Sequence, residues 1–306
     1  MLDSFKRMAE HTPGVGTVYT KLRRIRHRLS EPDFYSPLPS LKEARRREQT
    51  IWGEPSRVLP AVDLNEVEQL SLYDELKNFY AELPFEDEPR SGLRYYFHNE
   101  WFGDADAILL YSMIRHLRPK RIIEIGSGFS SAVTLDTNDL FFGGDISCTF
   151  IEPNAERLLS LLNGRDREKH TILEKEVQDV ELALFGTLRP NDILFIDSSH
   201  VTKVYSDVNW LFFRVLPALA RGVFVHFHDV FYPFEYPKEW LFLDRRGWNE
   251  AYLLRAFLQY NSAFQIKFFN AYMVRYFRDR FRRDMPRWVQ DPPGSPWASS
   301  IWLQKV

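Results

Sequence analysis

The stretch that decides the fold is residues 191–237, NDILFIDSSHVTKVYSDVNWLFFRVLPALARGVFVHFHDVFYPFEYP. It contains two apolar runs typical of buried strands, 193–196 and 223–227, joined by a segment of helical character at 204–219. A strand, a helix and a second strand in this order form parallel neighbours in one sheet. The stretch therefore predicts an α/β protein whose strands end at a common edge.

Polar side chains follow both of these strands. Asp197 ends the first strand and His200 comes three residues later, whereas His228 and Asp229 end the second strand. Ligands bind at the carboxyl ends of the strands in open α/β sheets. We therefore expect these four side chains, called the rim below, to converge. His226 precedes His228 by two residues and is interpreted as a partner of the rim or a buried, hydrogen-bonded histidine.

Composition limits the class of protein. The 306 residues, 44% of them hydrophobic, suffice for one large domain with extensions or for two small domains. A net charge of −2 argues against a general nucleic-acid binder, which is usually basic. The single cysteine, Cys148, excludes a disulfide framework and a cysteine-based zinc site. With no secretory signal and no long apolar run, a cytoplasmic protein without a transmembrane segment is expected.

Residues 1–60 form a basic N-terminal extension or linker, with cationic blocks at 21–29 and 42–49. These blocks are interpreted either as a solvated helix and linker or as a contact for acidic partners. Residues 61–306 then form the main domain, with a core at about 95–235.

Strand-like and helix-like segments alternate through this core, which predicts a Rossmann-like, doubly wound and mostly parallel sheet. The pattern changes after Pro237. We interpret residues 231–296 as a C-terminal cap over the strand ends, and 299–305 as a last strand that returns to the sheet.

A glycine-rich turn in RIIEIGSGFSSAVTL, residues 121–135, joins a short strand to a helix. Gly126 and Gly128 give the turn a permissive backbone and allow a ligand to approach the main chain. Ser127 and Ser130 are placed to cap the helix or to bond a ligand carboxylate at its positive end.

Acidic and amide side chains end the next two strands. Glu152 has the placement of an acid that binds ribose hydroxyls in nucleotide-binding folds. Gln178 and Asp179 close the following strand, within 170–180, and either face an adenine or are solvated at the surface.

The motif EIGSGFSS, with Glu152 and Asp197 at later strand ends, resembles the S-adenosylmethionine (SAM) signature of class I methyltransferases. The segment after Asn99 and the motifs IDSSH, VHFHD, WNE and SIWL resemble a bacterial subgroup that accompanies glycan or natural-product biosynthesis. The resemblance implies SAM as the cofactor. It implies cofactor contacts from Asn99, Glu124, Gly126, Ser127, Gly128, Ser130, Glu152, Gln178, Asp179 and Asp197.

The rim is also similar to that of catechol-type, divalent-metal-dependent O-methyltransferases. Asp197 matches their first metal-binding aspartate, and His200 takes the position of their lysine base. His228 and Asp229 stand where those enzymes have an Asp–Asn pair. The resemblance implies a metal site of Asp197, His228 and Asp229, with His200 and Asp197 as catalytic residues. An imidazole ligand favours Mn²⁺, Fe²⁺ or Zn²⁺ over Mg²⁺.

We therefore expect a SAM-dependent methyltransferase that methylates a hydroxyl of a small polar acceptor, such as a sugar or a natural product, with or without a divalent metal. Its partner is a small molecule rather than nucleic acid, and exposed aromatic side chains are compatible with a homodimer. Two alternatives stay open. Two histidines and a carboxylate near one strand end also suit a non-haem iron oxygenase on this fold. A non-catalytic protein that retains the cofactor site is the other alternative.

Overall fold

The computed structural model describes residues 36–289 and 298–306, so the basic block at 21–29 lies outside the described residues. These residues divide into two compact units. One consists of the described residues as far as Glu54 together with Lys238–Gly247, and the other of Pro55–Pro237 with Trp248–Val306. Within the described part of the chain, no helix has the length and apolar character needed to cross a bilayer.

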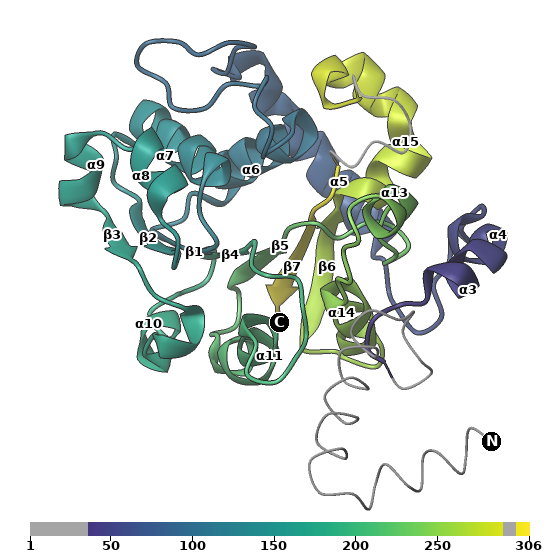
Figure 1. Cartoon of the computed structure of the whole chain (residues 1–306). Helices are drawn as coiled ribbons and strands as arrows, with labels where there is room; N and C mark the ends of the chain where they lie inside the picture. Colours follow the sequence, from purple (N-terminus) through teal and green to yellow (C-terminus); the bar gives the residue numbers. More distant parts are fainter. Residues whose placement is uncertain (1–35, 290–297) are drawn as a thin grey trace, which may run out of the picture. The chain divides into compact units, whose positions relative to one another are not determined.

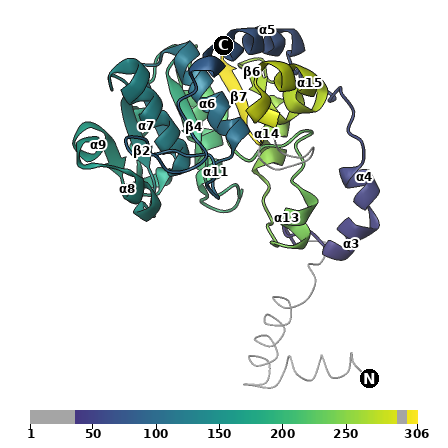
Figure 2. The same cartoon turned by 90° about the horizontal axis from the view of Figure 1, so that it is seen from above.

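A seven-stranded sheet is the centre of the larger unit, in the order β3-β2-β1-β4-β5-β7-β6 (Figure 1). Strands β1 to β5 run parallel, whereas β7 is antiparallel to both of its neighbours. Figure 2 shows the succession β2, β4, β7 and β6 from above. The predicted Rossmann-like, mostly parallel sheet is confirmed. The strands are Arg121–Ile125, Ser147–Ile151, Thr171–Leu173, Ile193–Ile196, Phe224–Phe227, Phe264–Phe269 and Ile301–Lys305.

Helices cover both faces of this sheet, with α6, α7 and α8 on one face and α10, α11 and α14 on the other (Figure 1). Every residue of β4 and β5 is buried as a result, which is why these two strands are continuous apolar runs apart from one histidine. The helices are α5 Glu66–Leu76, α6 Asp104–Leu117, α7 Phe129–Phe142, α8 Glu156–Leu161, α9 Gly164–Lys169, α10 Leu182–Phe185, α11 Asp207–Trp210, α12 Leu216–Ala218, α14 Glu250–Leu258 and α15 Asn270–Asp284. Shorter turns are the 3₁₀ segments η1 Lys77–Glu82, η2 Val177–Asp179 and η4 Pro286–Val289 and the π-helical turn η3 Leu211–Val215.

The helix between β4 and β5 begins later than its sequence pattern indicates. The predicted segment was 204–219, but α11 begins at Asp207 because the Ser206 hydroxyl accepts a hydrogen bond from the Asn209 N–H at 3.2 Å and caps the helix. Val204 and Tyr205 stay outside the helix, and both are exposed. The loop from β4 to α11 is therefore long enough to form part of a ligand site.

Two segments of the predicted C-terminal cap, 231–296, pack in other parts of the structure. Phe264–Phe269 is strand β6, which pairs with β7 and forms the edge of the sheet. Lys238–Gly247 packs in the smaller unit. Within the predicted cap, helices α13 Lys238–Phe242 and α14 are separate, because residues 243–249 are not helical.

The smaller unit joins segments that are far apart in the sequence. It holds α3 Leu41–Arg46 and α4 Glu48–Trp52 together with α13 Lys238–Phe242. The Phe242 ring lies 5.6 Å from that of Trp52 and 5.1 Å from the Arg45 guanidinium carbon. Lys238 Nζ lies 3.0 Å from Glu48 Oε1. Aromatic contacts and one exposed ion pair therefore hold this unit together.

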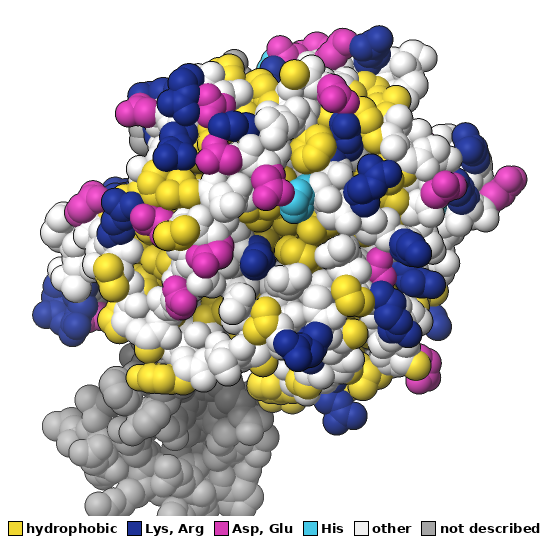
Figure 3. Space-filling view, turned by 180° about the vertical axis from the view of Figure 1, so that it is seen from behind, with side chains coloured by type: hydrophobic (Ala, Val, Ile, Leu, Met, Phe, Trp, Pro, Cys, Tyr) yellow, Lys and Arg dark blue, Asp and Glu magenta, His cyan; other side chains and the backbone are white. Residues whose placement is uncertain are grey.

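Charged side chains are mixed on the face of the molecule that Figure 3 shows. Acidic and basic groups lie interspersed among hydrophobic and uncharged ones, and basic groups do not gather into one extended patch there. This face therefore lacks the continuous positive surface that nucleic-acid binding proteins present.

Candidate active site

The turn between β1 and α7 packs directly on the end of β4. Gly126 has φ +77°, and a Cβ atom there would lie 1.6 Å from the carbonyl oxygen of Asp197. A side chain is therefore excluded at this position, both by space and by backbone conformation. Because the turn and Asp197 touch, the glycine motif and the rim belong to one site.

Glu124 supports the turn from below. Its carboxyl group is completely buried, and Oε1 accepts hydrogen bonds from the hydroxyls of Ser130 at 2.6 Å and Ser131 at 2.9 Å. Burial raises the pKa of Glu124 to about 8. The Ser131 hydroxyl in turn accepts a hydrogen bond from the Gly128 N–H at 3.0 Å. Glu124 and Ser130 therefore shape the turn rather than line a pocket.

A cavity of about 520 Å³ lies beside the turn, a volume in the range of small-ligand sites. Its lining includes four of the predicted cofactor residues, namely Gly126, Glu152, Gln178 and Asp197. It does not include the other six, namely Asn99, Glu124, Ser127, Gly128, Ser130 and Asp179. Lys203, Tyr205 and Asp207 also line the cavity. Sequence reasoning did not assign them to a cofactor, because the first two lie in the loop before α11 and Asp207 begins that helix, outside any motif.

Several polar atoms around this cavity are oriented but unused. Glu152 accepts hydrogen bonds from the N–H groups of Ser127 at 3.1 Å and Asn154 at 2.8 Å, which fix its carboxylate. The buried Gln178 Oε1, Ser127 Oγ and Ser198 Oγ have no hydrogen-bond partner among the described residues. Buried polar atoms are normally paired, so these atoms fit a bound ligand that carries hydrogen-bond donors and acceptors.

Asn99 forms a local turn and is not brought into the cavity. Its Oδ1 accepts hydrogen bonds from the N–H groups of Trp101 at 2.9 Å and Phe102 at 2.7 Å, and its Nδ2 donates to the Tyr96 carbonyl at 2.8 Å. Asparagine commonly bonds the backbone two or three residues on in this way. Its amide therefore organises the loop that precedes α6.

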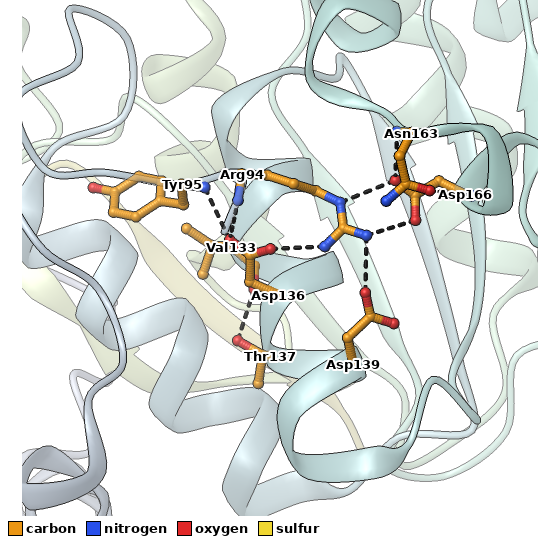
Figure 4. A network of polar contacts seen from close by, with 8 residues as sticks. All are labelled: Arg94, Tyr95, Val133, Asp136, Thr137, Asp139, Asn163 and Asp166. Carbon is orange, nitrogen blue, oxygen red and sulfur yellow. Dashed lines mark hydrogen bonds and ion pairs between the residues drawn. The ribbon is translucent and has the colours of Figure 1, made fainter. Parts of the chain in front are cut away.

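Arg94 fastens this loop to helices α7 and α9 (Figure 4). Its guanidinium lies 2.7 Å from Asp136, 2.8 Å from Asp139 and 2.6 Å from Asp166. Asp136 also accepts the backbone N–H groups of Arg94 and Tyr95, at 2.8 Å and 2.9 Å. Asp136 and Asp139 belong to α7 and Asp166 to α9, so one arginine ties the loop to two helices.

The loop presents Trp101 to the solvent beside the glycine turn. The Arg157 guanidinium carbon lies 3.4 Å from the centre of the Trp101 ring. The Arg157 side chain also runs along the turn, because a Cβ atom at Gly128 would lie 3.1 Å from its Cδ. This pair could not be predicted from the sequence, since its members lie on different elements.

The rim residues lie together at the ends of β4 and β5. His200 Nε2 lies 3.3 Å from Asp197 Oδ1 and 3.6 Å from Asp229 Oδ2, and its Nδ1 lies 2.9 Å from Glu250 Oε2. His228 Nε2 lies 3.7 Å from Asp229 Oδ1. Glu250 was not singled out from the sequence as a site residue, because nothing local connects α14 to the loop after β4.

Three ligand atoms of the rim have the spacing of a metal site. One atom each from Asp197, His200 and Asp229 lies within 4.8 Å of the other two. Ligands that bind one ion at about 2.1 Å lie roughly 3 to 3.5 Å apart, close to the distances from His200 to the two carboxylates. His228, which the sequence resemblance places in the metal set, is not part of this group.

The chain is similar to known methyltransferases. Residues 123–230 match the family model described as "Methyltransferase domain". Residues 123–230 of this chain therefore form a methyltransferase domain. An uncharacterised protein of Archaeoglobus fulgidus is 37% identical over 165 residues, which are 52% of this chain and 73% of that protein.

Solved structures show more distant similarity. The O-methyltransferase TomG from Streptomyces achromogenes, solved with SAM, is 15% identical with a TM-score of 0.41, over 81% of this chain and 92% of TomG. The SAH-bound Podospora anserina methyltransferase PaMTH1 is 13% identical with a TM-score of 0.39, over 89% of this chain and 99% of that one.

In this methyltransferase the rim charges perturb one another. Burial by itself would lower the pKa of His200, but its hydrogen bonds to Asp197 and Glu250 hold that pKa well above its usual value. Burial would raise the pKa of Asp197, but His228 and His200 keep it below the ordinary value. Burial raises the pKa of Asp229 despite the two histidines. His200 is therefore cationic at neutral pH when no other cation is present.

His226 in β5 and His228 just after it differ in their surroundings. The His226 ring stacks on Phe195 at 3.9 Å, and burial together with His228 holds its pKa well below the usual value. His228 lies against Phe102 at 5.2 Å; burial would lower its pKa, but Asp197 and Asp229 raise it. His226 is thus a neutral core residue of the methyltransferase, and His228 faces the rim.

Proposed function

We propose that this methyltransferase transfers the methyl group of SAM to a hydroxyl of a small polar acceptor, such as a sugar or a natural product, with the help of a divalent cation. The observation that carries the proposal is the grouping of two carboxylates and an imidazole, from Asp197, Asp229 and His200, beside a cavity of nucleoside size. Asp197 belongs to both, so the donor and the acceptor would meet there.

The cofactor fits the residues around the cavity. The oriented carboxylate of Glu152 would accept the ribose hydroxyls, and the unpaired Gln178 Oε1 would accept from the adenine amino group. Gly126, Ser127 and Gly128 would approach the methionine end through the backbone. We do not assign cofactor contacts to Asn99 or Asp179, since the first bonds its own loop and the second is exposed outside the lining.

The chemistry requires an in-line displacement. The acceptor oxygen attacks the methyl carbon of SAM, the carbon–sulfur bond breaks, and its electron pair stays on the sulfur of S-adenosylhomocysteine (SAH). The hydroxyl proton has to leave the acceptor, and His200 Nε2 is the rim atom suited to take it once His200 is neutral. A cation near His200 lowers the pKa of the imidazole, which offsets the effect of the carboxylates.

A bound divalent cation would orient the acceptor oxygen and lower its pKa. Asp197 and Asp229 would hold it, and two assignments of the imidazoles follow. In the assignment based on the sequence resemblance, His228 is the third ligand and His200 is the base. In the assignment favoured by the spacing in the structure, His200 is the third ligand.

Binding experiments test the proposal directly. Calorimetry with SAH should show one site per chain, and a chain loaded with Mn²⁺ should methylate hydroxylated sugars or natural products in the presence of SAM. A chain that binds neither SAM nor SAH in the presence of Mn²⁺ would refute it. The Mn²⁺ affinities of His200→Ala and His228→Ala then separate the two assignments, since only the variant that lacks a ligand loses affinity.

The proposed acceptor is a small molecule rather than nucleic acid, in keeping with the net charge of −2 and the mixed charges in Figure 3. A cytoplasmic location and a homodimer remain predictions from the sequence.

A further inference from the structure

The segment 248–250 of this chain clamps His200 from several directions. Glu250 Oε2 lies 2.9 Å from His200 Nδ1, and the centre of the Trp248 ring lies 4.3 Å from that of the imidazole, with the two rings tilted by 36°. The backbone N–H groups of Asn249 and Glu250 both donate to the His200 carbonyl, at 3.0 Å and 3.1 Å. The Asn249 side chain accepts from the N–H and hydroxyl of Thr202, at 2.5 Å and 2.6 Å.

These contacts fix a backbone that would otherwise be unfavourable. His200 has φ +58°, in the left-handed region that residues with a side chain seldom adopt. Such a conformation persists only where the surrounding structure determines it. Residues 248–250 provide that support, through contacts with the His200 main chain, its ring and its Nδ1.

The carboxylate of Glu250 is placed for the imidazole alone. Glu250 is 1% exposed and His200 is 4% exposed. Among the described residues, the Glu250 side chain is hydrogen-bonded to His200 through Oε2, and its Oε1 has no partner. A buried carboxylate costs free energy unless it is paired. The pairing of Glu250 with His200 Nδ1 therefore offsets the cost of burying Glu250.

A carboxylate at 2.9 Å from Nδ1 also decides where the imidazole keeps its proton. Glu250 Oε2 lies closer to Nδ1 than Asp197 Oδ1 lies to Nε2, 2.9 Å against 3.3 Å, so the geometry favours a neutral His200 that carries its proton on Nδ1. Its Nε2 then presents a lone pair to Asp197 and Asp229, at 3.3 Å and 3.6 Å. His200 Nε2 is the atom that is needed whether His200 acts as the base or as a metal ligand.

We propose that Glu250 is a positioning residue of the methyltransferase, which fixes the orientation and the tautomer of His200 so that its Nε2 faces the rim. The effect of Glu250 on catalysis rests on the proposed function. Its effect on the tautomer of His200 does not. Carboxylates that orient a histidine in this way usually alter activity or metal affinity about 10- to 100-fold when replaced.

Proton–nitrogen correlation spectra of the metal-free full chain, labelled with nitrogen-15 histidine, test the tautomer. The His200 signals are identified by their loss in His200→Gln and are recorded at a pH at which the imidazole is neutral. We expect a protonated Nδ1 in the native protein and a shift towards protonated Nε2 in Glu250→Gln. A native His200 protonated at Nε2, or a Glu250→Gln variant with an unchanged tautomer, would overturn the proposal.

Glu235→Gln is the matched control, because Glu235 is also a shielded carboxylate in this unit but accepts its hydrogen bond from Tyr252. Glu235→Gln should leave the His200 signals as they are.

SAH affinity reports separately on folding and on the proposed function. It should be the same in the native protein, Glu250→Gln and Glu235→Gln. For the active enzyme we expect Glu250→Gln to lower kcat about 10- to 100-fold while the KM for SAM changes little. A Glu250→Gln variant with native kcat and SAH affinity would contradict the positioning role, whereas a native chain that fails to bind SAH would contradict the proposed function instead.

Discussion

The buried carboxyl group of Glu124 should make the stability of this methyltransferase depend on pH. Glu124 lies under the cofactor turn, and burial raises its pKa from an ordinary value of 4.5 to about 8. The folded state therefore holds a proton that the unfolded chain releases at a lower pH. A raised pKa of this kind contributes stability that is fully present below the unfolded pKa and is lost as the pH rises through the folded pKa.

The size of the effect follows from the shift. Each pH unit between the two pKa values changes the free energy of unfolding by about 1.4 kcal/mol for one group. Between about pH 5 and pH 7, Glu124 should therefore remove about 2.5 kcal/mol of stability. Glu124→Gln removes the titration and keeps an oxygen that can accept from the hydroxyls of Ser130 and Ser131.

The assay is urea unfolding of the native protein and Glu124→Gln at a series of pH values, followed by tryptophan fluorescence. The difference between the two proteins isolates Glu124, because all other titrating groups are shared. We expect the variant to gain about 2.5 kcal/mol relative to the native protein from about pH 5 to pH 7. A difference that stays constant with pH, or that changes in the opposite direction, would refute the reasoning.

Four further substitutions test other parts of the domain. Gly126→Ala should abolish SAH binding in calorimetry, because its Cβ would lie 1.6 Å from the Asp197 carbonyl oxygen; native affinity would show that the turn is not as described. Arg94→Ala should lower the free energy of unfolding by about 3 to 5 kcal/mol in urea, because it leaves the buried Asp136 without its cation, and a loss below about 1 kcal/mol would show that the carboxylates are not desolvated. His226→Phe should retain activity within about two-fold, since the His226 ring is a neutral packing group whose Nδ1 has no partner among the described residues. His228→Phe should lower kcat/KM by at least about ten-fold. Equal losses in these two variants would remove the distinction between them.

The sequence was sufficient for the sheet and for the place of the site. Strands β4 and β5 are short apolar runs, so their pattern identified them, and the polar residues after them had to meet at one edge of a parallel sheet. Gly126 could be singled out because only glycine serves a turn of this kind next to another backbone. These features depend on local chemistry, which a single sequence displays.

The detailed arrangement of the rim could not be obtained in the same way. Alternation along β5 places His226 and His228 on one face, but it says nothing about Asp229, whose φ is +55°, or about His200, whose φ is +58°. Both residues leave the strand geometry, and their side-chain directions depend on packing by other elements. Glu250 reaches His200 from α14, so its part in the site depends on the tertiary fold.

Asp197 explains why the proposed donor and acceptor sites adjoin. Its carbonyl oxygen bounds the turn at Gly126, its side chain lines the cavity, and its Oδ1 lies 3.3 Å from His200 Nε2. This is possible because β4 lies between β1 and β5, which carry the cofactor turn and the second half of the rim. Methyl transfer needs the sulfonium and the acceptor oxygen to be aligned at short range. Because these three strands are neighbours, the sulfonium and the acceptor oxygen would meet at one edge of the sheet. The loops that follow the strands would then determine which acceptor binds.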